Sequence, residues 1–332
     1  MNGVVSLSIR AGFLGTGSCL PEKELTNFDM EKIVDTTDEW IQSRTGIKSR
    51  RFADDQTATS DLAYGAALKA LEAADITAKD LDMIIVATIT PDMHFPSTAC
   101  IIQDKLGADN ASAFDIGAAC SGFVYASTIA KQFVESGQSK YVLVIGAETL
   151  SKILDFTDRN TCVLFGDGAG AAIIGPVKTG GIVAMDLGAK GSGGKFLTVP
   201  AGGSRMPASQ ETIDNRLHYI SMDGSEVFKF AVRIMASSSK TVIEKAGWSI
   251  DDLDYLVPHQ ANIRIINSAG KKLKLPSERV HVNLDKFGNT SAGSVPIALD
   301  EAVRSGKIKS GDKVVLVAFG GGLTWGALAV EF

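Results

Sequence analysis

The sequence predicts an α/β fold that is built twice over. Apolar runs typical of buried strands alternate with amphipathic stretches typical of helices. The segment GAACSGFV at 117–124 aligns without a gap with GNTSAGSV at 288–295. Two further pairs lie at nearly the same offset: 73–82 with 245–254, and 140–146 with 313–319. Three similar offsets, each of roughly half the chain, indicate a duplicated unit.

The expected strands and helices follow from the apolar pattern. Six apolar runs bounded by turn residues are predicted strands: 83–88, 141–146, 169–174, 256–258, 314–319 and 327–330. Amphipathic stretches at 59–74 and 226–246 are predicted helices. Continuous apolar strands must be covered on both faces, so we expect two sheets in a five-layer α/β/α/β/α arrangement. The glycine-rich stretch 188–203 breaks the pattern and is predicted to be a surface excursion.

The composition predicts a soluble globular protein. The chain has 332 residues, of which 45% are hydrophobic and 21% charged, with a formal net charge of −5. No apolar run approaches the ~20 residues of a membrane span, and the opening segment 1–12 lacks the pattern of a signal peptide. We therefore expect a cytoplasmic protein that binds neither membranes nor, given its acidic balance, nucleic acid. The halves, placed at 1–178 and 179–332, should pack as one unit because no low-complexity linker separates them.

Cys120 is a candidate nucleophile. It follows the strand-like ASAFDIG at 111–117 and precedes SGFVYASTIAKQFV at 121–134, whose apolar spacing is helical. The thiol is therefore predicted at a helix N-terminus, where unpaired N–H groups and the helix dipole should lower its pKa from the free value of about 8.5. The other interpretation is a small buried cysteine, because free cysteine is among the most buried residue types.

His259 and Asn289 are candidate partners of that thiol. His259 lies in PHQAN at 258–262, directly after an apolar strand, where α/β proteins place ligands. Asn289 lies in the second copy of the cysteine turn, so a two-fold pairing of the halves would bring it towards Cys120. A lone histidine is nevertheless usually structural. The remaining histidines are interpreted as structural or surface residues: His94, His218 and His281.

Other cysteine and glycine patterns narrow the chemistry. The four cysteines are dispersed without a C-x-x-C pair, which favours neither a disulfide framework nor a zinc site. The glycine runs from Gly15 and Gly166 do not complete G-x-G-x-x-G, and no P-loop occurs. The run Gly320-Gly321-Gly322 follows a predicted strand, allows close approach of a ligand, and could offer an N–H to an oxyanion.

Six motifs together carry a resemblance to one family. They are DEWIQSRTGI from Asp38, GAACSGF from Gly117, GDGAGA from Gly166, PHQAN from Pro258, GNTSAGSVP from Gly288 and FGGGLTWG from Phe319. Essentially from end to end, the chain resembles β-ketoacyl-acyl-carrier-protein synthase III of bacterial fatty acid synthesis. That family belongs to the thiolase superfamily, whose duplicated five-layer fold agrees with the repeat. The DEWIxxRTGI signature and a Cys-His-Asn set are specific to this branch.

The resemblance implies a catalytic set and a reaction. Cys120 would take the acyl group of a short acyl-CoA as a thioester, with the backbone N–H groups of Cys120 and Gly321 forming an oxyanion hole. His259 and Asn289 would stabilise the enolate formed when malonyl-acyl carrier protein loses carbon dioxide. The resulting carbanion would attack the acyl-cysteine. The resemblance implies no metal ion and no cofactor, since the CoA thioester is itself a substrate.

The resemblance also implies binding residues. The CoA adenine would lie between Trp40 and Arg159, and the further CoA contacts would be Thr36, Arg44 and Asn262. Phe95 would reach across a homodimer interface and close the end of the partner's acyl pocket, which Leu164 also lines, so the starter would be short. The acidic carrier protein would dock on four basic residues: Lys229, Arg264, Lys271 and Lys272. The other interpretations are a core aromatic for Trp40, an ordinary interface aromatic for Phe95 and a merely solvated basic face.

Several functions stay open at this point. A thiolase needs a second reactive cysteine late in the chain, and none lies beyond Cys162. A synthase III-like condensing enzyme of secondary metabolism fits the same motifs, and an inactive paralogue would act as an assembly partner. The sequence does not show whether the starter is acetyl-CoA or a small branched acyl-CoA, nor does it show the kinetics, feedback inhibition or source organism.

Overall fold

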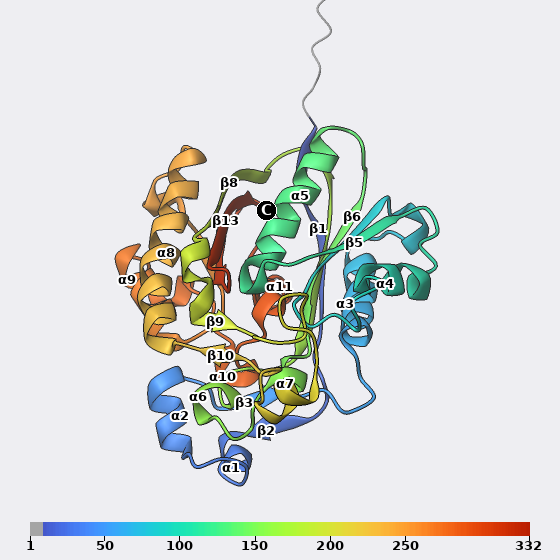
Figure 1. The fold of residues 1–332 in the computed structure, drawn as a ribbon. Helices are drawn as coiled ribbons and strands as arrows, with labels where there is room; N and C mark the ends of the chain where they lie inside the picture. The colour runs from blue at the N-terminus through green and yellow to red at the C-terminus, as the bar shows by residue number, and fades with distance from the viewer. Residues whose placement is uncertain (1–8) are drawn as a thin grey trace, which may run out of the picture.

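Two related sheets organise the protein, as seen in a computed structural model that describes residues 9–332 (Figure 1). The prediction made for the opening segment falls largely on residues 1–8, which lie outside the described residues. The first sheet has the strand order β1 (Arg10–Cys19), β7 (Gly168–Val177), β6 (Val142–Glu148), β4 (Met83–Ala87) and β5 (Ser112–Ile116). The second has the order β8 (Gly181–Ala189), β13 (Thr324–Glu331), β12 (Lys313–Gly320) and β11 (Tyr255–Pro258).

The second sheet repeats the first strand for strand, apart from the additional edge strand β5. In the first sheet β1 and β7 are antiparallel, β7 and β6 are antiparallel, and β6 and β4 are parallel. The second sheet has the same directions for β8 with β13, β13 with β12, and β12 with β11. One sheet uses strands up to Val177 and the other begins at Gly181, so we infer a boundary between the halves at this point.

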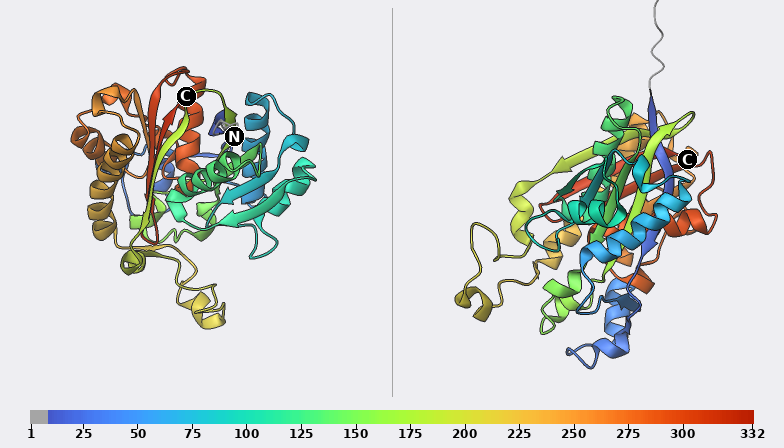
Figure 2. Two further views of the ribbon diagram at one scale, coloured as in Figure 1. Left: turned by 90° about the horizontal axis from the view of Figure 1, so that it is seen from above. Right: turned by 90° about the vertical axis from the view of Figure 1, so that its right-hand side faces the viewer.

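Helices complete five layers. Helices α5 (Gly122–Glu135) and α11 (Ser294–Arg304) lie between the sheets and contact strands of both. Helices α3 (Thr59–Ala73) and α4 (Thr98–Leu106) pack on the first sheet, while α8 (Gly224–Lys245) packs on the second beside α9 (Ile263–Lys272). The view from above in Figure 2 shows the sheets with α5 and α11 between them and the other helices outside. The expected α/β/α/β/α fold is confirmed.

Shorter elements connect these layers and surround one end of the molecule. The short strands are β2 (Glu24–Thr26), β3 (Ser49–Arg51), β9 (Leu197–Thr198) and β10 (Ser221–Met222). The short helices are α1 (Asn27–Met30), α2 (Asp38–Thr45), α6 (Arg159–Cys162), α7 (Gln210–Asp214) and α10 (Leu284–Phe287). The 3₁₀ turns are η1 (Ala78–Asp80), η2 (Ala119–Ser121), η3 (Leu150–Ile153), η4 (Gly191–Phe196), η5 (Ile250–Asp252), η6 (Ser277–Arg279) and η7 (Ser291–Gly293).

Glycines on β1 and β6 let neighbouring elements approach closely. A Cβ atom on Gly15 would lie 2.4 Å from the main-chain nitrogen of Ala74, so the glycine run from Gly15 serves the packing of α3 on β1. A Cβ atom on Gly146 would lie 2.1 Å from the carbonyl oxygen of Ala292. Gly146 therefore permits η7 to pack closely against β6. This packing holds the loop that carries Asn289 near the first sheet.

The structure shifts the repeat by one residue at the nucleophile. Ala119 begins η2 and Ser291 begins η7, and both adopt left-handed φ angles, of 45° and 46°. Each turn then runs directly into a central helix, α5 or α11. Cys120 is therefore equivalent to Ala292, and the gapless pairing of Cys120 with Ser291 is wrong. The gapless alignment depended on identical glycine and valine residues in the two segments. The backbone conformation of the two turns shows instead which residues are structurally equivalent.

Candidate functional site

Cys120 lies where two cavities meet. It occupies the turn η2, between the end of β5 and the start of α5, and its side chain is only 6% exposed. One cavity has a volume of about 730 Å³ and the other about 380 Å³, and both are open to solvent. Both cavities are lined by Cys120. The thiol thus lies at the junction of the two cavities, which we call the entrance cavity (the larger) and the inner chamber (the smaller).

His259 and Asn289 line the entrance cavity together with Cys120, although the three residues come from distant parts of the chain. His259 directly follows β11, and its N–H donates to the carbonyl of Val317 at 2.7 Å. Asn289 precedes η7, and its N–H donates to the carbonyl of Leu164 at 2.9 Å. The packing of the two halves therefore assembles the set that the motifs predicted as neighbours.

The hydrogen bonds of His259 are met by a tautomer that carries its proton on Nε2. Its Nδ1 is hydrogen-bonded to the hydroxyl of Ser294, which also accepts the N–H of Gln260 at 3.2 Å. The Ser294 hydroxyl can donate to Nδ1 while its oxygen accepts the N–H of Gln260, and we assign this arrangement, in which the ring proton resides on Nε2. Nε2 is buried and has no protein partner among the described residues. Burial lowers the pKa of His259 to about 3, so the ring is a neutral donor at physiological pH.

The amide of Asn289 is also oriented by its surroundings. Its Oδ1 accepts the main-chain N–H of Ser291 at 2.9 Å, which directs the donor end of the amide, Nδ2, to the other side. The cavity therefore holds two neutral N–H donors, from His259 and Asn289, near the thiol of Cys120. Such a pair suits an oxygen that gains negative charge during a reaction.

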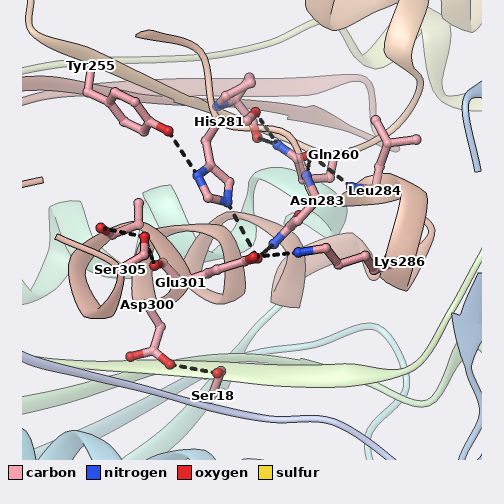
Figure 3. A network of polar contacts seen from close by, with 12 residues as sticks. Ser18, Tyr255, Gln260, His281, Asn283, Leu284, Lys286, Asp300, Glu301 and Ser305 are labelled. Carbon is pink, nitrogen blue, oxygen red and sulfur yellow. Dashed lines mark hydrogen bonds and ion pairs between the residues drawn. The ribbon is translucent and has the colours of Figure 1, made fainter. Parts of the chain in front are cut away.

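Gln260 ties the strand that carries His259 to the segment that leads to Asn289 (Figure 3). Its side chain is 1% exposed and makes four hydrogen bonds, all to main-chain groups. It donates to the carbonyls of Pro258 and His281 and accepts from the N–H groups of Asn283 and Leu284. Gln260 thus fixes the spacing between the two donors. In the same network, Nδ1 of the buried His281 is hydrogen-bonded to the hydroxyl of Tyr255, and its Nε2 lies 3.6 Å from the carboxylate of Glu301 (Figure 3).

The pKa of Cys120 departs from the expectation for a helix N-terminus. Burial raises the pKa of the thiol to about 12, although the neighbouring hydroxyl of Ser291 acts to lower it. The nearby carboxylate of Glu148 raises it further. A lowered pKa was expected, and the expectation is wrong for the ligand-free site because desolvation of a thiolate in this pocket outweighs the helix terminus. Reaction at Cys120 therefore requires a group that accepts its proton.

The inner chamber is mainly apolar and uses residues that the motifs did not mark. It is lined by Ile89, Leu150, Phe165, Leu197, Val199, Ile220 and the glycines and small residues around Cys120. Leu197 belongs to β9, within the stretch 188–203, so the prediction of a mere surface excursion is wrong there. The stretch returns to the site because Gly193 packs against Leu323, next to the turn of Gly321.

The two residues expected in the acyl pocket lie elsewhere in the single chain. Leu164 lines the entrance cavity and not the inner chamber. Phe95 is 86% exposed, on the loop between β4 and α4, and lines neither cavity of its own chain. Its neighbours Ile89 and Met93 are also exposed. Any contact of Phe95 with an acyl group must therefore be made in another copy of the chain.

The glycine run that begins at the last residue of β12 lies against the turn of the nucleophile. A Cβ atom on Gly320 would lie 2.5 Å from the main-chain nitrogen of Cys120, so only glycine fits there without displacement. The next residue, Gly321, lines the inner chamber beside Cys120. The main-chain segments at Cys120 and at Gly320–Gly321 are thus held close together beside the inner chamber. An oxyanion hole formed by their N–H groups would require this proximity.

An aromatic and cationic cluster lies at the outer cavity. The guanidinium groups of Arg44 and Arg159 lie over the ring of Trp40, at 5.0 and 5.2 Å from its centroid. Thr36, two residues before α2, has a buried hydroxyl with no hydrogen-bond partner among the described residues. Asn262 caps α9 through the N–H of Arg264 and donates to the carbonyl of Arg44. Trp40, Arg44 and Asn262 line the entrance cavity.

The predicted basic residues divide into two groups. Lys229 and Arg264 line the entrance cavity, where Lys229 pairs with Glu226 at 2.7 Å and Arg264 lies over the ring of Phe228. Lys271 and Lys272 are exposed at the far end of α9 and do not line the cavity. The four cations therefore extend from the entrance cavity, at Lys229 of α8 and Arg264 of α9, to the far end of α9.

Comparison with known proteins decides the family. The family model for 3-oxoacyl-[acyl-carrier-protein (ACP)] synthase III matches residues 114–191, and the model for its C-terminal part matches residues 243–332. A β-ketoacyl-[acyl-carrier-protein] synthase III from Caldanaerobacter subterraneus is 63% identical over 98% of both chains. One from Clostridioides difficile is 63% identical over 98% of this chain and 99% of its own. The chain belongs to the β-ketoacyl-acyl-carrier-protein synthase III family.

Comparison with solved structures supports the same family. The crystal structure of the synthase III from Aquifex aeolicus is 49% identical and superimposes with a TM-score of 0.90, covering 97% of this chain and all of that one. The resemblance inferred from the motifs is confirmed, and this synthase III chain is a condensing acyltransferase with the thiolase-like fold.

Motif reading missed several groups around this synthase III site. Ser294, which holds Nδ1 of His259, lies in the motif GNTSAGSVP but was not singled out there, and Glu148, which is buried near Cys120, lies in no recognised motif. A signal for Glu148 exists, since it is a lone carboxylate that ends the otherwise apolar strand β6. Within residues 9–332, no group of three or more His, Cys, Asp or Glu side chains is arranged to hold a metal ion. No helix in the same range is long and apolar enough to cross a bilayer.

Proposed function

We propose that this synthase III condenses a short acyl-CoA with malonyl-acyl carrier protein to give β-ketoacyl-acyl carrier protein, the first condensation of fatty acid synthesis. One observation carries the proposal. The cavity that opens at the surface brings Cys120, His259 and Asn289 together and continues past the thiol into a mainly apolar chamber. A thioester entering by the first space would place its acyl chain in the second.

Acyl transfer is the first step. The sulfur of Cys120 attacks the thioester carbonyl of acyl-CoA, a new carbon–sulfur bond forms, and the bond to the CoA sulfur breaks. The oxygen of the tetrahedral intermediate would be held by the backbone N–H groups of Cys120 and Gly321, whose chains are held together by the close fit of Gly320. CoA leaves as the thiolate and takes up a proton.

Decarboxylation and condensation follow in the same cavity. The thioester oxygen of malonyl-acyl carrier protein would accept hydrogen bonds from Nε2 of His259 and Nδ2 of Asn289. As the carbon–carbon bond to the carboxylate breaks, these neutral donors stabilise the enolate without a proton transfer. The carbanion then attacks the acyl-cysteine, a carbon–carbon bond forms, and Cys120 leaves as the thiolate. Since side-chain donors supply the stabilisation, the proposal uses no metal ion and no cofactor.

The outer cluster would bind CoA. An adenine can enter between Trp40 and Arg159 once the guanidinium lifts from the ring, because both faces suit a flat aromatic group. The unpaired hydroxyl of Thr36 would hydrogen-bond the base, and Arg44 and Asn262 would line the passage for the rest of CoA. The carrier protein would dock on the basic residues of α8 and α9, because it is strongly acidic: Lys229, Arg264, Lys271 and Lys272.

The proposal includes a cytoplasmic homodimer. β5 is an edge strand of the first sheet, with a free side for pairing, and the exposed Phe95 loop leads from the neighbouring strand β4 towards α4. An exposed loop with Ile89, Met93 and Phe95 on it suits an interface with a second copy. In that copy Phe95 would close the inner chamber and limit the starter to a short acyl group, with Leu164 lining the passage outside it.

Turnover with a panel of acyl-CoA primers tests the proposed function. Purified protein is mixed with malonyl-acyl carrier protein and acetyl-, isobutyryl-, hexanoyl- or decanoyl-CoA, and the β-ketoacyl product is identified by mass spectrometry. The proposal expects product from the short primers and little from decanoyl-CoA. Product formed only with malonyl-CoA, or no product at all, would contradict it.

A further inference from the structure

A buried carboxyl group lies next to the nucleophile and has no part in the reaction as described above. Glu148 ends β6 and is completely buried. Its carboxylate accepts hydrogen bonds from the hydroxyl groups of Thr88, Thr90 and Ser291 and from the N–H groups of Ile89 and Thr90. Burial and hydrogen bonds, with no cation, govern its titration. The titratable group that faces it is Cys120.

The two oxygens of Glu148 are not equivalent. Oε2 accepts both the hydroxyl and the N–H of Thr90, the hydroxyl of Thr88 and the N–H of Ile89 at 3.1 Å. Oε1 accepts the hydroxyl of Ser291 at 3.0 Å and only a long 3.3 Å contact from Ile89. A proton added to this carboxyl group would therefore reside on Oε1, where it faces the oxygen of Ser291.

Ser291 connects this oxygen to the thiol. Ser291 lines the inner chamber together with Cys120, and its turn η7 packs directly against η2, the turn that carries the thiol. A hydroxyl has one proton, so it can donate either to Glu148 or to Cys120. With an ionised Glu148, Ser291 donates to Oε1 and accepts the S–H. With a thiolate at Cys120, Ser291 donates to the sulfur and accepts the O–H of Glu148.

No other group of the site is suited to take this proton. His259 already carries a hydrogen on Nε2, because Nδ1 is held by Ser294, and it therefore acts as a donor. Any water in the cavities beside Cys120 is a far weaker base than a carboxylate. Burial raises the pKa of the thiol to about 12, which makes a proton acceptor necessary near neutral pH.

We propose that Glu148, acting through the hydroxyl of Ser291, accepts the proton of Cys120 as the thiol attacks acyl-CoA. The proton of the sulfur moves to Ser291, the proton of Ser291 moves to Oε1 of Glu148, and the charge passes from the carboxylate to the sulfur. After the acyl group is transferred, Glu148 returns the proton by way of the solvent or the departing CoA thiolate. This inference rests on the proposed function, because acyl transfer to Cys120 is the step that it explains.

The environment of Glu148 suits that role. Burial raises the pKa of this carboxyl group to about 7, which is where an acid–base group works best near neutral pH. The route also predicts a characteristic pH dependence. The wild-type rate at Cys120 should rise until Glu148 is ionised and then level off above about pH 7. Without proton transfer to Glu148, the reaction rate of Cys120 should rise in proportion to the hydroxide concentration up to the pKa of the thiol.

The Ser291→Ala variant removes the link with little risk to the fold. Ser291 has a left-handed φ of 46°, and the equivalent Ala119 of the first half has a φ of 45°, so the fold already accommodates alanine in this conformation. The main-chain N–H that holds Asn289 is retained. Ser239→Ala is the matched control, since it removes a buried hydroxyl from α8 that bonds only to its own helix.

Two reactions of Cys120 are measured between pH 6 and 9. Alkylation by iodoacetamide is followed at the Cys120 peptide by mass spectrometry, which separates it from the exposed Cys100, and acylation is followed with acetyl-CoA. Ser291→Ala should slow both reactions by about 10²-fold at pH 7. It should also remove the plateau, so that the logarithm of each rate rises linearly with pH with a slope of one. Glu148→Gln should also abolish the plateau, because an amide does not accept a proton in this range, and Ser239→Ala should behave as wild type.

The outcomes separate this inference from the proposed function. An unchanged plateau in Ser291→Ala overturns the inference. Equal losses of acylation and of malonyl-acyl carrier protein decarboxylation also overturn it, because they would show that Ser291 only positions Asn289. If wild-type protein is alkylated at Cys120 but takes no acetyl group, the proposed function fails, and the alkylation profile still decides the role of Glu148.

Discussion

Substitution of Gly320 by alanine should damage catalysis through geometry alone. The new Cβ atom would lie 2.5 Å from the main-chain nitrogen of Cys120 and 3.2 Å from the Cβ of Ala119. Ordinary carbon contacts are no closer than about 3.4 Å, so β12 and η2 must separate by roughly 1 Å, a displacement that typically costs up to ~10²-fold in rate. The separation moves Cys120 away from Gly321, and with it one of the two proposed oxyanion donors, whose loss typically costs ~10²–10³-fold.

We therefore expect Gly320→Ala to acylate Cys120 about 10²-fold more slowly than wild type, with a stability loss of ~1–3 kcal/mol for overpacking. The assay is single-turnover acylation by acetyl-CoA, followed by intact mass, together with a chemical unfolding curve. Gly203→Ala is the control, because a Cβ atom there meets nothing within 4 Å. Acylation of Gly320→Ala within threefold of wild type would refute the proposed geometry of the oxyanion hole.

Three further variants test the assigned roles. His259→Ala should lower decarboxylation of malonyl-acyl carrier protein by ~10²–10³-fold while Cys120 still becomes acylated, and loss of acylation alone would reverse the assignment. Arg264→Glu should raise the KM for malonyl-acyl carrier protein by about tenfold in steady-state kinetics, and should raise the KM for acetyl-CoA less. A wild-type KM for malonyl-acyl carrier protein that does not change with salt would count against docking at Arg264. Phe95→Thr should improve use of long primers by roughly one to two decades in competition assays, and a wild-type preference for medium-chain acyl-CoA would rule out gating by Phe95.

The fold could be predicted well from the sequence where apolar strands are continuous. The six predicted strands correspond to β4, β6, β7, β11, β12 and β13, and the two predicted helices correspond to α3 and α8. β1 was missed because its glycines look like a loop, although Gly15 is there so that α3 can pack closely. The repeat was recognised, but the alignment of the two turns was displaced by one residue. The amino-acid sequence does not show that Ala119 and Ser291 share a left-handed backbone conformation.

The site was predictable at the level of motifs but not of its electrostatics. Cys120, His259 and Asn289 could be named because each lies in a distinctive segment, and the structure places all three on one cavity. The direction of the pKa shift of Cys120 depends on burial, which a local helix argument cannot supply. The contact of Ser291 with Glu148 joins residues from different halves, so no local pattern reveals it.

The acyl chamber was the least predictable part. Its wall includes Leu197 from a glycine-rich stretch and Ile220 from the segment before β10, and neither has a motif. Leu164 was assigned to the chamber by family resemblance, yet it faces the entrance cavity, one residue before Phe165, which lines both. Neighbouring residues in such a turn point in different directions, so a one-residue difference decides which cavity a side chain meets.

The most direct test of the whole account is the mass of the protein after incubation with acetyl-CoA. Wild-type chain should gain one acetyl group, and digestion should locate it on Cys120 rather than on the exposed Cys100. Cys120→Ser should gain none while keeping the wild-type unfolding transition, because a serine hydroxyl is a far weaker nucleophile at this pH. Subsequent addition of malonyl-acyl carrier protein should remove the acetyl group from wild-type protein as acetoacetyl-acyl carrier protein. An acetyl group located elsewhere, or a Cys120→Ser variant that still condenses, would contradict the central claim that Cys120 is the nucleophile.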